Sequence, residues 1–282
     1  MKKQQAILVS GGFILLILLF FFGQTSPAKT DLPAKPMAEA AGTPPLITTG
    51  EVVLKAKKNL TQQQIVRLLE LENGVVRGDV KAQQIKVYKQ LANFWGDTAR
   101  QPSIGAFYFG EAAKLENSEK NLTFAAHLLL DNLMVDTDAA FQNWQAVQAK
   151  TLFERSLELN PSNDSSKVGL GACYLFGNIS SNPMQGIMAI RQVVEKDSNN
   201  VYGQMMLGLG GVKSGQYDKA IERFLFVVRK QPDNLDAVFN LAETYDRKGD
   251  KQNAVQWYKV AEKMVAIPEA KKEIEDRIKT LQ

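Results

Sequence analysis

The chain has 282 residues, of which 45% are hydrophobic and 23% are charged, and its formal net charge is +4. These values are those of an ordinary globular protein that is long enough to bury a sizeable core. They lack the concentrated basic stripe that nucleic-acid-binding domains carry, which argues against a nucleic-acid partner.

The N-terminal residues form the first recognisable element. Lys2 and Lys3 precede residues 6–23, an uncharged segment made mostly of Ile, Leu and Phe. A helix of this length, rising about 1.5 Å per residue, nearly crosses a hydrocarbon core of about 30 Å. We therefore predict a transmembrane signal-anchor over residues 6–23. The lysines predict that residues 1–5 lie in the cytoplasm and that the rest of the chain lies outside it.

A cleaved signal peptide is the alternative for this segment. The apolar run is longer than the usual central region of a signal peptide, and no clear small-x-small cleavage site follows it. No cysteine follows it closely either, which argues against a lipoprotein. We expect a single-pass protein of a bacterial inner membrane, with its folded part in the periplasm.

Residues 24–50 are rich in Pro, Ala, Thr and Gly and contain few large apolar residues. Such a composition cannot bury enough apolar surface to fold, so we predict a flexible linker. From residue 51 onward the strong patterns are helical, and no alternating run predicts a strand. The expected helices cover residues 61–72 with Thr61 as N-cap, 80–95 with Asp79 as N-cap, 102–116 beginning at Pro102, 122–135, and 138–159.

A 34-residue recurrence organises the C-terminal half. It pairs Leu207 with Leu241, Gly215 with Gly249, Ala220 with Ala254, and Phe224 with Tyr258. In spacing and residue types, residues 149–267 resemble the tetratricopeptide repeat. The resemblance implies pairs of antiparallel helices that stack into an all-α solenoid.

The resemblance extends upstream with less regularity. Leu170, Gly171 and Tyr174 match a first helix, and the 37 residues from Leu170 to Leu207 predict a three-residue insertion within residues 177–183. We interpret residues 51–148 as degenerate helical repeats. Residues 268–282 form an amphipathic stripe that predicts a cap helix, although a helix that docks a partner remains the alternative.

Few residues could carry chemistry. His127, the single histidine, lies in an apolar helical run and is expected in the core, and the single cysteine, Cys173, is expected to be a small buried residue. The glycines of residues 207–213 follow no strand, so the repeat explains them better than a phosphate-binding loop does. We predict no enzyme, cofactor, metal site or small-molecule substrate.

By resemblance, the first helix of each repeat lines a concave groove that binds protein. The groove positions implied here are Val168, Ala172, Leu175, Phe176, Tyr202, Met205, Met206, Leu209, Asp236, Phe239, Asn240 and Glu243. Most of them are apolar, whereas a groove that clamps a peptide carboxylate carries Lys, Arg and Asn. Such a surface suits an amphipathic helix or a partly unfolded chain.

The predicted function is a protein-binding scaffold or adaptor that takes a helix or extended segment of a partner. Envelope assembly, secretion and protein maturation are the processes in which anchored proteins of this layout act. Two alternatives remain. One is a self-associating homo-oligomer whose groove is filled internally, and the other is a secreted repeat protein with a cleaved signal peptide.

Overall fold

The computed structural model describes residues 46–77 and 80–282, which lie within one unit spanning Thr43–Gln282. The predicted anchor at residues 6–23 lies outside the described residues, as does most of the predicted linker. No helix in the described ranges is long and apolar enough to cross a membrane.

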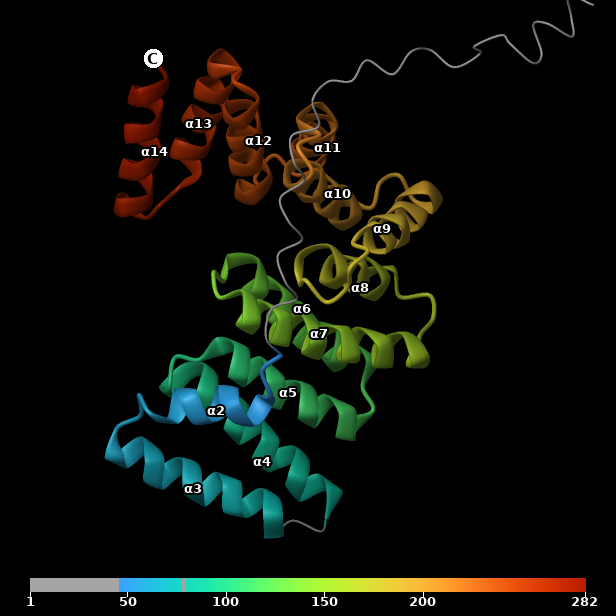
Figure 1. The fold of residues 1–282 in the computed structure, drawn as a ribbon, viewed down its shortest axis with the longest axis vertical. Helices are drawn as coiled ribbons and strands as arrows, with labels where there is room; N and C mark the ends of the chain where they lie inside the picture. The colour runs from blue at the N-terminus through green and yellow to red at the C-terminus, as the bar shows by residue number, and fades with distance from the viewer. Residues whose placement is uncertain (1–45, 78–79) are drawn as a thin grey trace, which may run out of the picture. The chain divides into compact units, whose positions relative to one another are not determined.

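The described residues are helical and contain no strand, which confirms the all-α prediction (Figure 1). In chain order the helices are α2 (Thr49–Lys57), α3 (Gln62–Arg77), α4 (Lys81–Asn93), the π-helix η1 (Phe94–Thr98), α5 (Pro102–Glu116), α6 (Glu119–Val135), α7 (Ala139–Leu159), α8 (Asp164–Phe176), α9 (Met184–Lys196), α10 (Val201–Lys213), α11 (Tyr217–Lys230), α12 (Leu235–Lys248), α13 (Lys251–Met264) and α14 (Pro268–Leu281).

Several helix boundaries follow the sequence signals. Thr61 caps α3 by accepting a hydrogen bond from the Gln64 N–H at 3.3 Å, and Pro102 opens α5, as predicted. The prediction for Asp79 is wrong, because Val80 is the N-cap residue of α4 and makes no side-chain capping bond. The predicted linker over residues 24–50 extends too far, because α2 begins at Thr49, with Thr48 as its N-cap in a capping box that includes Glu51.

An asparagine N-cap recurs with the repeat, in addition to the caps that the sequence patterns predict. Asn163, Asn200 and Asn234 each accept a hydrogen bond from the backbone N–H three residues later, at 2.9, 2.8 and 2.9 Å. Asn is among the strongest N-cap residues because its side-chain oxygen satisfies a free helical N–H. The first helices α8, α10 and α12 therefore begin at equivalent positions.

Helices α6 to α13 pack as successive pairs, α6 with α7, α8 with α9, α10 with α11 and α12 with α13, and α14 packs on α13. The second helix of each pair contributes one large residue to the core at the same repeat position. These residues are Phe153, Ile190, Phe224 and Tyr258, which are 0, 0, 0 and 4% exposed. The longer connection from α8 to α9, across residues 177–183, accommodates the predicted insertion.

Small residues allow the paired helices to approach closely. A Cβ atom added at Gly186 of α9 would lie 2.3 Å from the carbonyl oxygen of Gly171 in α8. A Cβ atom at Gly208 of α10 would lie 2.5 Å from Cε1 of Phe224 in α11. The glycines of residues 207–213 lie within α10, so the structure gives them a packing role.

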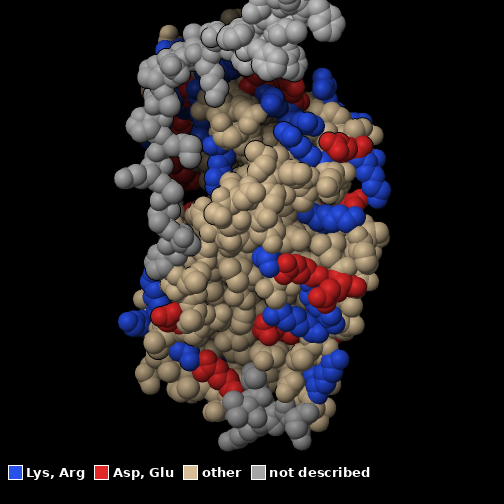
Figure 2. All heavy atoms as spheres, turned by 45° about the vertical axis from the view of Figure 1, so that its right-hand side comes forward, with Lys and Arg blue, Asp and Glu red and all other residues tan. Residues whose placement is uncertain are grey.

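The face of the molecule in Figure 2 carries Lys and Arg side chains mixed with Asp and Glu side chains, separated by wide uncharged areas. No single sign of charge dominates this face. It therefore offers no extended basic surface of the kind that binds a phosphate backbone.

Gly249 closes α12 in the left-handed region, with a φ of 87°, and no atom lies within 4 Å of the position a Cβ would take. We expect Gly249→Ala to lower the free energy of unfolding by about 1 kcal/mol, because only backbone strain opposes it. Gly249→Asn should cost less, because Asn tolerates this conformation better. Urea denaturation of the two variants checks this expectation, and an unchanged stability of Gly249→Ala would contradict it.

Candidate partner-binding groove

The twelve predicted groove residues lie on the three first helices α8, α10 and α12, as expected, but they are not equally accessible. Val168, Ala172, Leu175 and Met206 are buried in the core at 0, 0, 5 and 9% exposure. They stabilise the packing of α8 and α10 with their neighbours and offer no surface to a ligand. The predicted groove must therefore be corrected at these positions.

A second group of the predicted residues is partly buried. Phe176, Tyr202, Met205 and Leu209 pack against the main core cluster. Phe176 also lies below a cation, since Nζ of Lys213 is 5.6 Å from the centre of its ring. These side chains are therefore only partly accessible to a ligand.

His127 of α6 lies beside this second group and is only half-buried, although the sequence predicted a core position. Its Nε2 is 2.8 Å from the Ser165 hydroxyl and its Nδ1 is 3.5 Å from the Tyr202 hydroxyl. Its ring makes edge contacts with Phe153 and Tyr202 at centroid distances of 5.1 and 5.2 Å. Burial lowers the pKa of His127, because the imidazolium is poorly solvated there.

We expect His127 to titrate below its ordinary pKa of 6.5. The unfolded chain then binds more protons than the folded chain below pH 6.5, so this residue makes the protein less stable as the pH falls through that value. An NMR titration checks the pKa directly, because the sequence contains one histidine. A pKa at or above 6.5 would contradict the expected burial effect.

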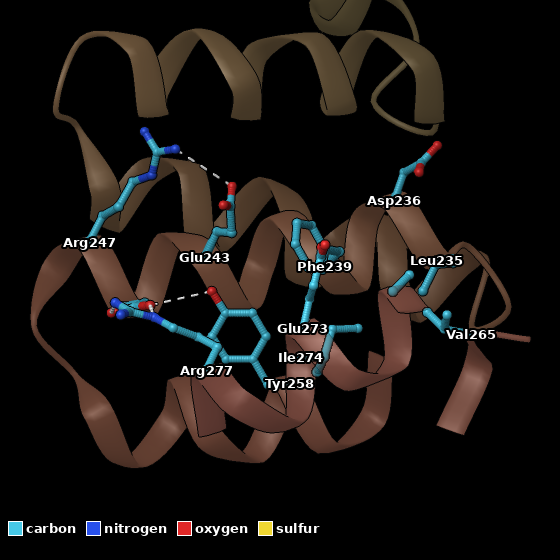
Figure 3. A pocket seen from close by; sticks show the side chains of 12 residues that line it. Leu235, Asp236, Phe239, Glu243, Arg247, Tyr258, Val265, Glu273, Ile274 and Arg277 are labelled. Carbon is cyan, nitrogen blue, oxygen red and sulfur yellow. Dashed lines mark hydrogen bonds and ion pairs between the residues drawn. The ribbon is translucent and has the colours of Figure 1, made fainter. Parts of the chain in front are cut away.

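The remaining predicted residues belong to α12, and three of them line an open pocket of about 620 Å³ between α12, α13 and α14. These three are Asp236, Phe239 and Glu243, which lie along α12 in Figure 3. Asn240 is partly exposed but turns its amide to its own helix, donating to the Asp236 carbonyl oxygen at 2.8 Å.

The pocket has an apolar wall centred on Phe239. This side chain is 36% exposed, and its ring lies 6.0 Å from that of Tyr258 in an edge contact. Ile274 of α14 and Val265, in the connection between α13 and α14, complete the wall (Figure 3). The ring is thus accessible beside a cavity with an apolar wall, an arrangement that ligand-binding pockets use.

Two ion pairs fix the polar side of the pocket. Arg277 of α14 donates two hydrogen bonds to the Asp246 carboxylate, at 2.7 and 2.8 Å, and the Tyr258 hydroxyl donates to the same carboxylate at 3.3 Å. Arg247 and Glu243 form a looser pair at 3.6 Å. Burial, followed by the Asp246 charge, raises the pKa of Tyr258 to about 12, so its hydroxyl stays protonated at neutral pH.

Several lining residues were missed in the sequence. Asp246 lies on α12 and Arg277 on α14, 31 residues later. No local sequence motif predicts a contact between residues this far apart. Ala270 and Ile274 both belong to the predicted amphipathic stripe of the last helix, and this stripe is the signal that the sequence offers for the α14 side of the pocket.

The groups with other possible chemistry are dispersed. Among the described residues no three His, Cys, Asp or Glu side chains are grouped so that they could hold a metal ion. Cys173 is buried as predicted, and burial raises the pKa of its thiol, which keeps it protonated and unreactive.

Comparison with known proteins gives a family match for part of the chain. Residues 185–269 match the model of the tetratricopeptide repeat family. This segment includes helices α10 to α13 and most of α9, together with the pocket residues of α12 and α13.

Among solved structures, the chain is similar to YrrB, described as a TPR protein with an unusual peptide-binding site, at 17% identity over 70% of this chain and 98% of that chain, with a TM-score of 0.41. It is also similar to MamA from Desulfovibrio magneticus RS-1, from residue 41 to the end, at 21% identity over 66% of this chain and 96% of that chain, with a TM-score of 0.43. The match to the tetratricopeptide repeat family thus covers residues 185–269 of this chain.

Proposed function

We propose that this protein is a non-enzymatic scaffold that holds a helix or an extended segment of a partner protein in the pocket around Phe239. The observation that carries the proposal is an exposed aromatic side chain on the wall of an open pocket, bordered by fixed ion pairs. A hydrophobic anchor inside a polar rim is the usual arrangement of a protein-binding hot spot.

The proposal includes attachment to a bacterial inner membrane through residues 6–23, with the repeats in the periplasm. It is supported by the uncharged Ile-, Leu- and Phe-rich segment and by Lys2 and Lys3 before it. A scaffold tethered in this way would concentrate its partner at the membrane, for envelope assembly, secretion or protein maturation. A secreted form with a cleaved signal peptide is the alternative, and the N-terminal sequence of the mature protein distinguishes the two.

Phe239→Glu tests the binding site. We expect this change to reduce crosslinked partner recovered from membranes at least about ten-fold, because a carboxylate in the apolar wall loses solvation without gaining a partner. The double variant Met205→Glu/Phe239→Glu should reduce the recovered partner by at least the same factor. Met188→Glu is the matched control, because Met188 is 56% exposed on α9, outside the pocket.

Circular dichroism must show that each variant remains folded. Partner recovery from folded Phe239→Glu equal to that of the control would contradict the proposed site. Sedimentation of the wild-type protein and of Phe239→Glu addresses self-association: a homo-oligomer that dissociates in the variant would favour the structural alternative, in which a second copy fills the groove.

A further inference from the structure

The carboxylates at the pocket fall into two classes. Asp246 is neutralised by two hydrogen bonds from Arg277, and Glu243 has Arg247 at 3.6 Å. Asp236 and Glu273 also line the pocket, but within the described ranges neither carboxylate has a hydrogen bond or an ion pair.

The two arginines that line the pocket are already paired with Asp246 and Glu243. The charge of the pocket that remains unpaired is therefore negative. Arg277 is held in a two-point contact with a carboxylate whose side chain is only 13% exposed, which fixes the arginine in place. Asp236 and Glu273 are exposed and therefore able to receive a cation from outside.

A third carboxylate extends this charge beyond the pocket. Asp131 of α6 lies four residues after His127, and its pKa is raised by burial and by the charge of Asp236. The charge of Asp236 thus acts on Asp131 of α6 as well as on the pocket. A positive charge brought next to Asp236 would offset that effect.

We propose that the occupant of the pocket is a protein segment that carries a large apolar side chain beside a lysine or arginine. This inference rests on the function proposed above and adds the chemistry of the partner. The apolar side chain packs against Phe239 and Ile274, and the basic side chain pairs with Asp236 or Glu273. An acidic segment would place like charges together and leave these carboxylates unpaired.

Three short fluorescent peptides with the same central Leu-Phe pair test this chemistry by anisotropy, using the full chain in a mild detergent. Their flanking residues are Lys in the first, Ser in the second and Glu in the third. We expect the Lys peptide to bind most tightly and the Glu peptide least. Raising the salt from about 50 to about 500 mM should reduce the difference, because solvent-exposed charges are screened.

The variant Asp236→Asn/Glu273→Gln keeps the shape of both side chains and removes both charges. We expect it to weaken binding of the Lys peptide about five-fold and to leave binding of the Ser peptide unchanged, since exposed ion pairs are individually weak. Glu195→Gln/Glu222→Gln removes two exposed charges from α9 and α11, outside this pocket, and should change neither affinity.

The outcomes separate the two levels of the proposal. If the Ser peptide binds as tightly as the Lys peptide, or if the double variant leaves the affinities unchanged, the inference of a basic partner is overturned. The proposed binding of a partner in the pocket around Phe239 is then unaffected. If all three peptides fail to bind, or bind equally well to Phe239→Glu, the proposed function itself fails. If the chain self-associates and the peptides do not compete, the occupant is a second copy and the inference is also overturned.

Discussion

Gly186→Ala is expected to lower the free energy of unfolding by about 1–2 kcal/mol, although alanine is the better helix former. The new Cβ atom would lie 2.3 Å from the backbone oxygen of Gly171, and a backbone atom cannot turn aside as a side chain can. Helices α8 and α9 must therefore separate, which loosens the packing around Ile190. Overpacking of this kind costs typically 1–3 kcal/mol, and the gain of about 1 kcal/mol in helix propensity offsets only part of it.

Gly50→Ala is the matched control for this prediction. Gly50 is exposed in the first turn of α2, and an added Cβ atom would approach only the Thr48 hydroxyl oxygen, at 3.8 Å. We expect this variant to be neutral or slightly stabilising. Urea titrations followed by circular dichroism compare the two, and equal midpoints would show that the contact between α8 and α9 does not limit stability.

Phe224→Ala is expected to have the largest effect, about 3–5 kcal/mol. Phe224 is 0% exposed and fills the space between α10, α11 and α12, so its removal leaves a cavity that the surrounding helices cannot close fully. In a stacked repeat array, this cavity is expected to destabilise both neighbouring helix pairs as well.

The contact between Phe224 and Gly208 makes this prediction sharper. Gly208→Ala alone should destabilise by about 2 kcal/mol, because its Cβ atom would lie 2.5 Å from the ring. In the Phe224→Ala background the same change should be neutral or stabilising, because the space is then empty. A double-mutant cycle measures the coupling, and simple additivity of the two losses would refute the assigned contact.

The sequence was informative where one repeat determines its own packing. The 34-residue spacing predicted that Phe224 and Tyr258 occupy equivalent buried positions, because equivalent residues of successive repeats make equivalent contacts. It also placed Tyr202 and Phe239 on first helices. The asparagine N-caps Asn163, Asn200 and Asn234 follow the same intervals as Leu170, Leu207 and Leu241, so they are a further repeat signal that the sequence carries.

The sequence was less informative where separate repeats meet. Val168 and Ala172 were assigned to a groove by analogy with other repeats, but α6 and α10 both pack against α8 and bury that face. The pair between Asp246 and Arg277 depends on how α14 docks, which no local pattern encodes. His127 looked like a core residue because its neighbours are apolar, yet it lies at the edge of that core beside Ser165.

The proposed role of the pocket is tested most directly by site-specific photo-crosslinking in living cells. A photoreactive amino acid would replace Phe239 in one strain and Met188 in another. We predict a covalent adduct with a partner protein from position 239 and none from position 188, because only the first lies in the pocket. The same adducts from both positions, or none from position 239, would contradict a partner-binding pocket at α12 to α14.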